Sequence, residues 1–159
     1  MNTFSRCAAV SLLIGGVSVI QFMAQSTDPL VGTWELNVGK SKYGTGRAPK
    51  SETRTYVVAG QDIRATVKSV GIDGKPTSME FMMNDDGKDR PMTGHPDADA
   101  LSIRRVTASD VEFTLKKTGK VVITGTRTIS KDGKTMTITS KGTNAAGQTT
   151  HDVAVFEKR

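Results

Sequence analysis

The residues able to do acid–base or metal chemistry are few in this chain of 159 residues, which has two histidines and one cysteine. His95 shares a loop with Asp97 and Asp99, whereas His151 lies far along the chain. Zinc sites place their ligands at short, regular spacings that this set does not follow, and a turn at Pro96 accounts for Asp97 without a metal. We therefore predict no metal and no cofactor.

Two other arrangements resemble catalytic or calcium-binding motifs only in part. His151 and Asp152 are neighbours in a segment predicted to be extended, so their side chains point to opposite faces and cannot act as an acid–base pair. The stretch 84–87 (Asn-Asp-Asp-Gly) lacks the alternating acids and the final Glu of an EF-hand loop, which makes a hairpin turn the better interpretation. We predict that the protein is not an enzyme.

Arg127 is the remaining polar residue whose position points to a role. It alternates in phase with Ile123 and Ile129, so we expect its side chain to face the interior of the protein. A buried guanidinium needs a partner, because an isolated charge is costly to remove from water. The partner is either the protein itself, as a structural contact, or the acidic group of a ligand.

Turn signals and alternation predict the elements that position these residues. Asp-Gly-Lys occurs at 73–75, 86–88 and 132–134, and Asp-Gly supplies the positive φ angles of tight hairpins. Longer loops are predicted at 39–50 and 90–100, and no stretch predicts a long helix. The predicted strands are 30–38, 52–58, 62–70, 77–84, 101–106, 111–117, 121–130, 135–142 and 149–157.

The best-patterned hairpin has one apolar and one threonine-rich face. Val121, Ile123, Gly125 and Ile129 share a face with Arg127, and threonine dominates the other. Strands with one apolar face and no covering helices favour a closed barrel or a sandwich. We predict an all-β fold, an antiparallel up-and-down β-barrel of about eight to ten strands.

The first 26 residues have the features of a secretory signal peptide. Arg6 precedes an apolar run over 7–20, and 24–26 (Ala-Gln-Ser) fits a signal peptidase site with cleavage before Thr27. The alternative is an uncleaved anchor, since Phe22 and Met23 lengthen the apolar stretch. Cleavage would leave one domain, 27–159, in the periplasm or outside the cell, without stable membrane insertion.

Three short motifs carry a resemblance to a known family. Gly32-Thr33-Trp34 opens the first predicted strand, and 126–134 combines an arginine-containing strand with an Asp-Gly-Lys turn. The chain closes with Val-Phe-Glu-Lys at 155–158. In this order the motifs resemble the lipocalins and fatty-acid-binding proteins, and the chain looks like a bacterial, secreted, uncharacterised member of that group.

The resemblance implies a barrel whose interior holds a small apolar molecule. Gly32 and Trp34 would close one end, with the Arg127 guanidinium packed across the indole. The residues that would contact a ligand are Tyr56, Met79, Phe81, Arg105, Phe113, Ile123, Arg127 and Met136.

One departure from the family concerns the acid-binding clamp. Fatty-acid-binding proteins commonly carry Arg-x-Tyr on the last strand, where this chain has Ala154 and Phe156. A ligand is then predicted to be neutral, or to be held by Tyr56, Arg105 or Arg127.

Two functions remain open from the sequence. The first is an extracytoplasmic binding protein for a small lipophilic ligand, favoured by the small inward residues Ala65, Gly125 and Ser140, which leave space. The alternative is a filled barrel that acts as a structural or protein-interaction module. Aromatic residues are too few among the lysines and arginines to predict nucleic-acid binding, and the sequence predicts no oligomeric state.

Overall fold

The computed structural model describes residues 28–44, 48–143 and 147–159, so the predicted signal segment 1–26 lies outside the described residues. The described part contains eleven strands and one short 3₁₀ helix. They are β1 (Gly32–Leu36), η1 (Val38–Lys40), β2 (Lys42–Tyr43), β3 (Ser51–Ala59), β4 (Asp62–Val70), β5 (Pro76–Met83), β6 (Arg90–Thr93), β7 (Ala100–Arg105), β8 (Asp110–Lys117), β9 (Lys120–Ile129), β10 (Thr135–Thr143) and β11 (Thr149–Lys158).

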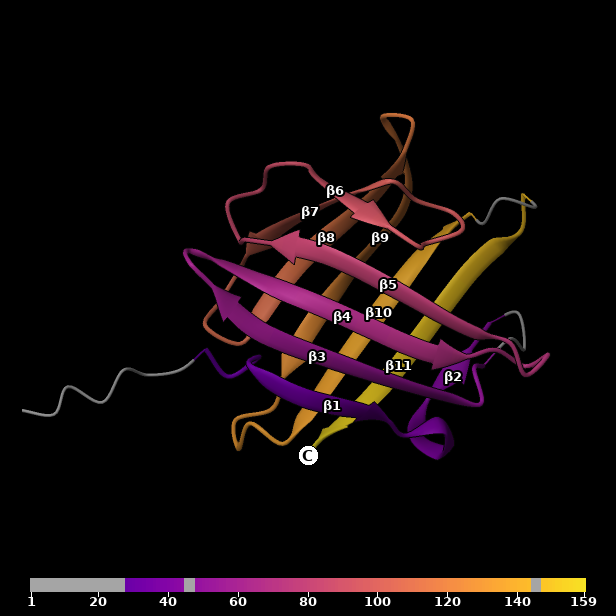
Figure 1. The fold of residues 1–159 in the computed structure, drawn as a ribbon, viewed down its shortest axis with the longest axis horizontal. Coiled ribbons are helices and arrows are strands. Elements are labelled where there is room, and N and C mark those ends of the chain that lie inside the picture. The colour runs from indigo at the N-terminus through magenta and orange to yellow at the C-terminus, as the bar shows by residue number, and fades with distance from the viewer. Residues whose placement is uncertain (1–27, 45–47, 144–146) are drawn as a thin grey trace, which may run out of the picture.

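The strands form one closed antiparallel barrel (Figure 1). From β3 to β11 each strand pairs with the next, while β1 pairs with β3 on one side and β11 on the other. The short β2 also pairs with β11, and together with η1 it continues the line of β1. Ten strands thus close the described barrel and β2 is an addition, which confirms the predicted all-β up-and-down fold.

Two strands lie in stretches predicted to be loops. β6 falls within 90–100 and pairs with each neighbour through only two residue pairs. Its Pro91 has no backbone N–H to donate, which makes a strand hard to predict there. β2 has two residues, too few for an alternating pattern to show.

A bulge corrects the predicted face of Val121. The register shifts between Leu115 and Lys116 of β8, so that Ile123 pairs with Leu115 but Val121 pairs with Lys116. The extra residue, Val122, changes the side on which its neighbours lie. Val121 is 58% exposed as a result, while Ile123 and Arg127 face the interior as predicted.

The end of the barrel near β1 is tightly packed. The largest fully buried side chains include Trp34, Tyr56, Phe156, Leu30 and Met136. The Trp34 indole donates a hydrogen bond from Nε1 to the Leu30 carbonyl oxygen at 2.8 Å, which satisfies its polar group inside the core.

The cation above Trp34 is Lys158, and the prediction that Arg127 packs there is wrong. Lys158 is the direct cross-strand partner of Trp34, and its Nζ lies 5.1 Å from the ring centroid. A Cβ at Gly32 would lie 2.9 Å from the Lys158 Cε, so glycine leaves the room that this side chain occupies. Arg127 is on β9, away from the β1–β11 pair, and faces the cavity instead.

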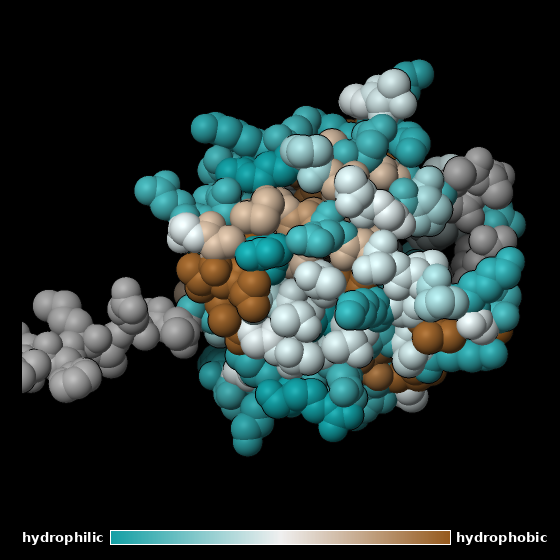
Figure 2. Space-filling view, in the orientation of Figure 1, coloured by the Kyte–Doolittle hydropathy of each residue, from teal (hydrophilic) through white to brown (hydrophobic). Residues whose placement is uncertain are grey.

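One outer face of the barrel is mostly polar. Figure 2 shows hydrophilic and intermediate atoms over most of this face, with a hydrophobic patch over the end of β3, where Val57 and Val58 are exposed. Among the described residues no helix has the length and apolar character to cross a membrane.

Candidate ligand cavity

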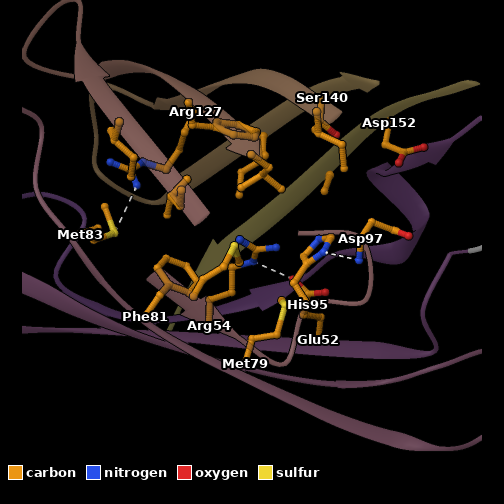
Figure 3. Close-up of a pocket in the computed structure, with 18 of the residues that line it drawn as sticks. Glu52, Arg54, Met79, Phe81, Met83, His95, Asp97, Arg127, Ser140 and Asp152 are labelled. Atoms are coloured by element: carbon orange, nitrogen blue, oxygen red, sulfur yellow. Dashed lines mark hydrogen bonds and ion pairs between the residues drawn. The ribbon is translucent and has the colours of Figure 1, made fainter. Parts of the chain in front are cut away.

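The barrel encloses a cavity of about 320 Å³ between its strands (Figure 3). Apolar side chains form most of its wall, and polar groups gather at two sides. Figure 3 shows Arg127 and Met83 at one side and His95, Asp97 and Asp152 at the other. The apolar wall includes Met79, Phe81, Met83, Leu101, Ile103, Phe113, Leu115, Ile123 and Ile138.

Alternation along β5, β8 and β9 explains why most of the predicted ligand-contacting residues meet here. Side chains two residues apart on a strand share a face, and the barrel turns that face inward. Their contact with a ligand stays a prediction. The predicted ligand-contacting residues that do line the cavity are Tyr56, Met79, Phe81, Phe113, Ile123 and Arg127.

Arg105 does not line the cavity, so its predicted place is wrong. It is the last residue of β7, in phase with the inward Leu101 and Ile103 but at the rim of the barrel. There its guanidinium forms ion pairs with Asp85 and, at 3.1 Å, with Asp28. Two carboxylates at the rim hold the side chain outside.

Met136 is inside the barrel but is not part of the cavity wall. It is completely buried and pairs in register with Ile129 and Phe156. The packed end of the barrel fills the space around it, so its predicted ligand contact is also misplaced.

The small residues that suggested free space have different surroundings. Ser140 lines the cavity, whereas Ala65 is buried in the core and does not line it. A Cβ at Gly125 would overlap the Phe113 ring and the Thr139 carbonyl oxygen. The space beside Gly125 is therefore already filled by an aromatic ring.

Arg127 is the charged residue buried most deeply in the described cavity wall, with 7% of its surface exposed. Its one hydrogen bond among the described residues runs from a guanidinium nitrogen to the Met83 sulfur at 4.0 Å, a weak acceptor. Burial lowers the pKa of Arg127, and the charges of Tyr56, Asp85 and Asp28 offset this only in part. The side chain stays cationic at neutral pH, because a guanidinium does not lose its proton in proteins.

Arg54 is the second arginine that lines the cavity, and its charge is balanced by a carboxylate of the protein. Its Nε lies 2.6 Å from a Glu52 oxygen, and its guanidinium stacks over the Phe156 ring at 4.9 Å. Burial lowers the pKa of Arg54. Glu52 and Tyr56 raise this pKa by more than burial lowers it, so the net change is upward. The sequence reasoning missed this pair, although Glu52, Arg54 and the inward Tyr56 alternate in phase on β3.

The loop between β6 and β7 covers one side of the cavity and carries His95. Nδ1 of His95 accepts a hydrogen bond from the Asp97 backbone N–H at 3.1 Å. Burial is the main cause that lowers the pKa of His95, and Arg54 and Lys117 lower it further. The imidazole is thus neutral at pH 7.

Both ends of this loop are fixed to the barrel. Gly94 has a φ of 83°, and a Cβ there would overlap the Ser78 carbonyl oxygen of β5. The Asp99 carboxylate accepts hydrogen bonds from the Thr118 backbone N–H at 2.9 and 3.2 Å. The loop holds His95 in place.

Tyr43 and Asp152 complete the polar side of the cavity. Asp152 accepts a hydrogen bond from the Gly44 backbone N–H at 2.9 Å, which ties β11 to the end of β2. Burial, and next the charge of Glu52, raise the pKa of Tyr43 to about 12. Within 28–44, 48–143 and 147–159, no group of three or more histidine, cysteine or carboxylate side chains lies close enough to hold a metal ion.

Comparison with known proteins identifies the fold. The structure of Rv2717c from M. tuberculosis is similar at a TM-score of 0.54 and 19% identity, over 82% of this chain and 93% of that one. The two proteins share a fold. The up-and-down β-barrel that the sequence predicted is confirmed.

Other known proteins are more distant. A zebrafish ileal bile acid-binding protein complexed with cholic acid has 16% identity and a TM-score of 0.48, over 82% of this chain and 99% of that one. The siderocalin Ex-FABP has 12% identity and a TM-score of 0.35, over 82% of this chain and 74% of that one. No protein-family model and no curated protein matches the sequence.

Proposed function

We propose that the protein binds a small lipophilic molecule with an acidic group inside its barrel. Arg127 carries this proposal, because a cation that is only 7% exposed has only a thioether as its described hydrogen-bond partner. The sequence left open whether Arg127 serves packing or a ligand. Lys158 occupies the structural position over Trp34, which favours the ligand.

The cavity supports the size and character of such a molecule. A volume of about 320 Å³ falls at the lower end of the range for small-molecule sites, and the wall is mainly apolar. Tyr56 is buried in the same wall, and its hydroxyl acts on both Arg54 and Arg127, so it can add a hydrogen bond to the acid-binding side. Binding, rather than catalysis, is the role we propose for this wall.

The proposal includes a place outside the cytoplasm. Arg6, the apolar run that follows it and the small residues at 24–26 support export to the periplasm or the medium. N-terminal sequencing of the exported protein is expected to give Thr27 as the first residue. Protein that retains Met1 in the membrane fraction would contradict this part.

Displacement of a fluorescent apolar probe by decanoic acid and by its methyl ester tests the ligand class. A charge-assisted hydrogen bond contributes about 1.5–3 kcal/mol, so the acid is expected to compete at least tenfold better than the ester. Arg127→Met should remove this advantage, whereas Arg105→Met, which changes an arginine outside the cavity, should keep it.

Three outcomes would count against the proposal. An ester that competes as well as the acid, or an acid preference that survives Arg127→Met, removes the role of Arg127. If neither compound binds at micromolar concentration, the filled barrel that acts as an interaction module becomes the better account.

A further inference from the structure

A second recognition point lies across the cavity from Arg127. His95, Asp97 and Asp152 line that side, together with the Glu52–Arg54 pair (Figure 3). A molecule whose acid lies at Arg127 directs its other end toward these groups. Their chemistry decides what that end can be.

The proton on His95 is placed by its contact with the loop backbone. Because Nδ1 accepts the Asp97 N–H, the neutral ring carries its proton on Nε2. No described residue accepts a hydrogen bond from Nε2. The ring therefore offers one donor that the protein does not use.

The donor is held in position before any ligand arrives. Gly94 packs against the Ser78 carbonyl oxygen on one side of His95, and Asp99 binds the Thr118 N–H on the other. The Asp99 backbone also bridges its neighbours, since its N–H donates to Lys116 and its carbonyl oxygen accepts from Met92. A donor on a fixed loop loses little freedom on binding, which favours affinity.

The charges around His95 select against a second acid. The charge of Arg54 is matched by Glu52 at 2.6 Å, and the carboxylates of Asp97 and Asp152 also line this side. A ligand carboxylate here would meet like charges. Of the two described cations that act on His95, Arg54 is already paired with Glu52, and Lys117 is exposed, so that water and salt screen its charge. The acceptor that fits is an uncharged oxygen.

We infer that His95 Nε2 donates a hydrogen bond to a neutral oxygen, a hydroxyl, carbonyl or ether group, at the end of the ligand remote from its acid. The ligand class is then a lipophilic acid that carries an oxygen function at its far end. This inference rests on the proposed function, since it takes the acid at Arg127 as given. It adds a specificity that Arg127 alone cannot supply.

Isothermal titration with decanoic acid, ω-hydroxydecanoic acid and decanedioic acid tests the inference. One net hydrogen bond to a neutral group changes affinity by roughly two- to tenfold, so the hydroxy acid is expected to bind that much tighter than decanoic acid. His95→Phe keeps a ring without a donor and should abolish the gain. His95→Gln has an Nε2 donor and should retain part of it, and His151→Gln, at an exposed histidine, should change nothing.

The outcomes separate the inference from the proposed function. Equal binding of decanoic and hydroxy acids, a gain that persists in His95→Phe, or a preference for the diacid overturns the inference alone. Decanoic acid binding that Arg127→Met leaves unchanged overturns the proposed function. Failure of all three acids to bind overturns both.

A measurement without ligand tests the placement of the proton. Long-range ¹H–¹⁵N spectra of imidazole rings distinguish the two neutral tautomers, and His151→Gln leaves His95 as the one histidine of the sequence. The expected result is the Nε2–H tautomer at pH 7. An Nδ1–H tautomer would remove the donor and overturn the inference.

Discussion

At the scale of single residues, Trp34 and Arg127 have different roles: Trp34 stabilises the fold, and Arg127 serves ligand binding. Trp34 is fully buried with its N–H satisfied, so its role is in the core. Arg127 is almost as deeply buried, but no described acid forms an ion pair with it, since Asp85 and Asp28, which act on its charge, are paired with Arg105. A side chain that costs stability and is still present points to a use in binding.

We expect Trp34→Ala to lower the free energy of unfolding by about 3–5 kcal/mol, the usual cost of emptying a large aromatic site in a core. Lys158→Met removes only the cation over the ring and should cost about 0.5–1 kcal/mol. Urea unfolding of both variants checks this. A loss below about 1 kcal/mol in Trp34→Ala would show that the indole does not hold the barrel closed.

Arg127→Met is expected to stabilise the free protein by about 1–2 kcal/mol, because methionine fills a similar space without a buried charge. Arg105→Met serves as the comparison, since it removes exposed ion pairs and should change stability by less than about 1 kcal/mol. The same unfolding experiment gives both values. A clear loss of stability in Arg127→Met would assign this residue to packing.

At the scale of elements, the loop between β6 and β7 is the part of the site that depends most on backbone geometry. Gly94 has a left-handed φ and also packs against β5, whereas Gly87 has a similar φ of 75° with open space where a Cβ would lie. The two glycines thus differ in whether an added Cβ would collide with another atom, which it would only at Gly94.

Gly94→Ala is expected to destabilise the protein by about 1–3 kcal/mol more than Gly87→Ala, because both pay for a positive φ but only Gly94→Ala meets a backbone oxygen. Thermal or urea unfolding of the pair isolates the contact. Equal losses in the two variants would mean that the loop is not held against β5.

The loop should also make stability depend on pH through His95. Its folded pKa lies below the ordinary value of 6.5, so the folded state favours the neutral ring. Protonation then favours the unfolded chain, and the stability present above about pH 6.5 is lost as the pH falls through the folded pKa. The groups that face the ring are Arg54 and Lys117, which lower its pKa, and Asp97 and Glu52, which raise it.

Urea unfolding at pH 7.5 and 5.5 checks this in the wild type and in His95→Gln. The wild type should lose more stability than the variant on acidification, because the carboxylates titrate in both proteins and only the wild type has the imidazole at position 95. Equal losses in the two proteins would show that His95 is not held in its neutral form.

At the scale of the whole molecule, the hairpins predicted the fold because each Asp-Gly turn and each alternating stretch is a local signal. The nine predicted strands all occur, but β2 and β6 were missed, since two to four residues are too few to show a period. Val121 was placed on the wrong face by a bulge, which depends on the pairing between β8 and β9 and leaves no mark in either strand alone.

The site was predictable to a similar extent. Parity along one strand placed Arg127 inside, because inward direction is a local property, and the family resemblance added Tyr56 and Phe113, which also line the cavity. The cation over Trp34 was misassigned, since its identity depends on which residue of β11 pairs with β1. The pairing of Arg54 with Glu52 is local to β3, but the stacking of Arg54 on Phe156 and the position of His95 arise from contacts between distant segments.

Our proposal places the acidic group of the ligand at Arg127, inside the barrel. The most direct measurement is the ¹³C resonance of carboxyl-labelled decanoic acid, followed with pH in the presence of the protein. A carboxylate beside a buried guanidinium should titrate with a pKa at least about one pH unit below that of the free acid. In Arg127→Met the bound signal should disappear or titrate at or above the pKa of the free acid. A bound acid with an undisturbed pKa in the wild type would contradict the claim.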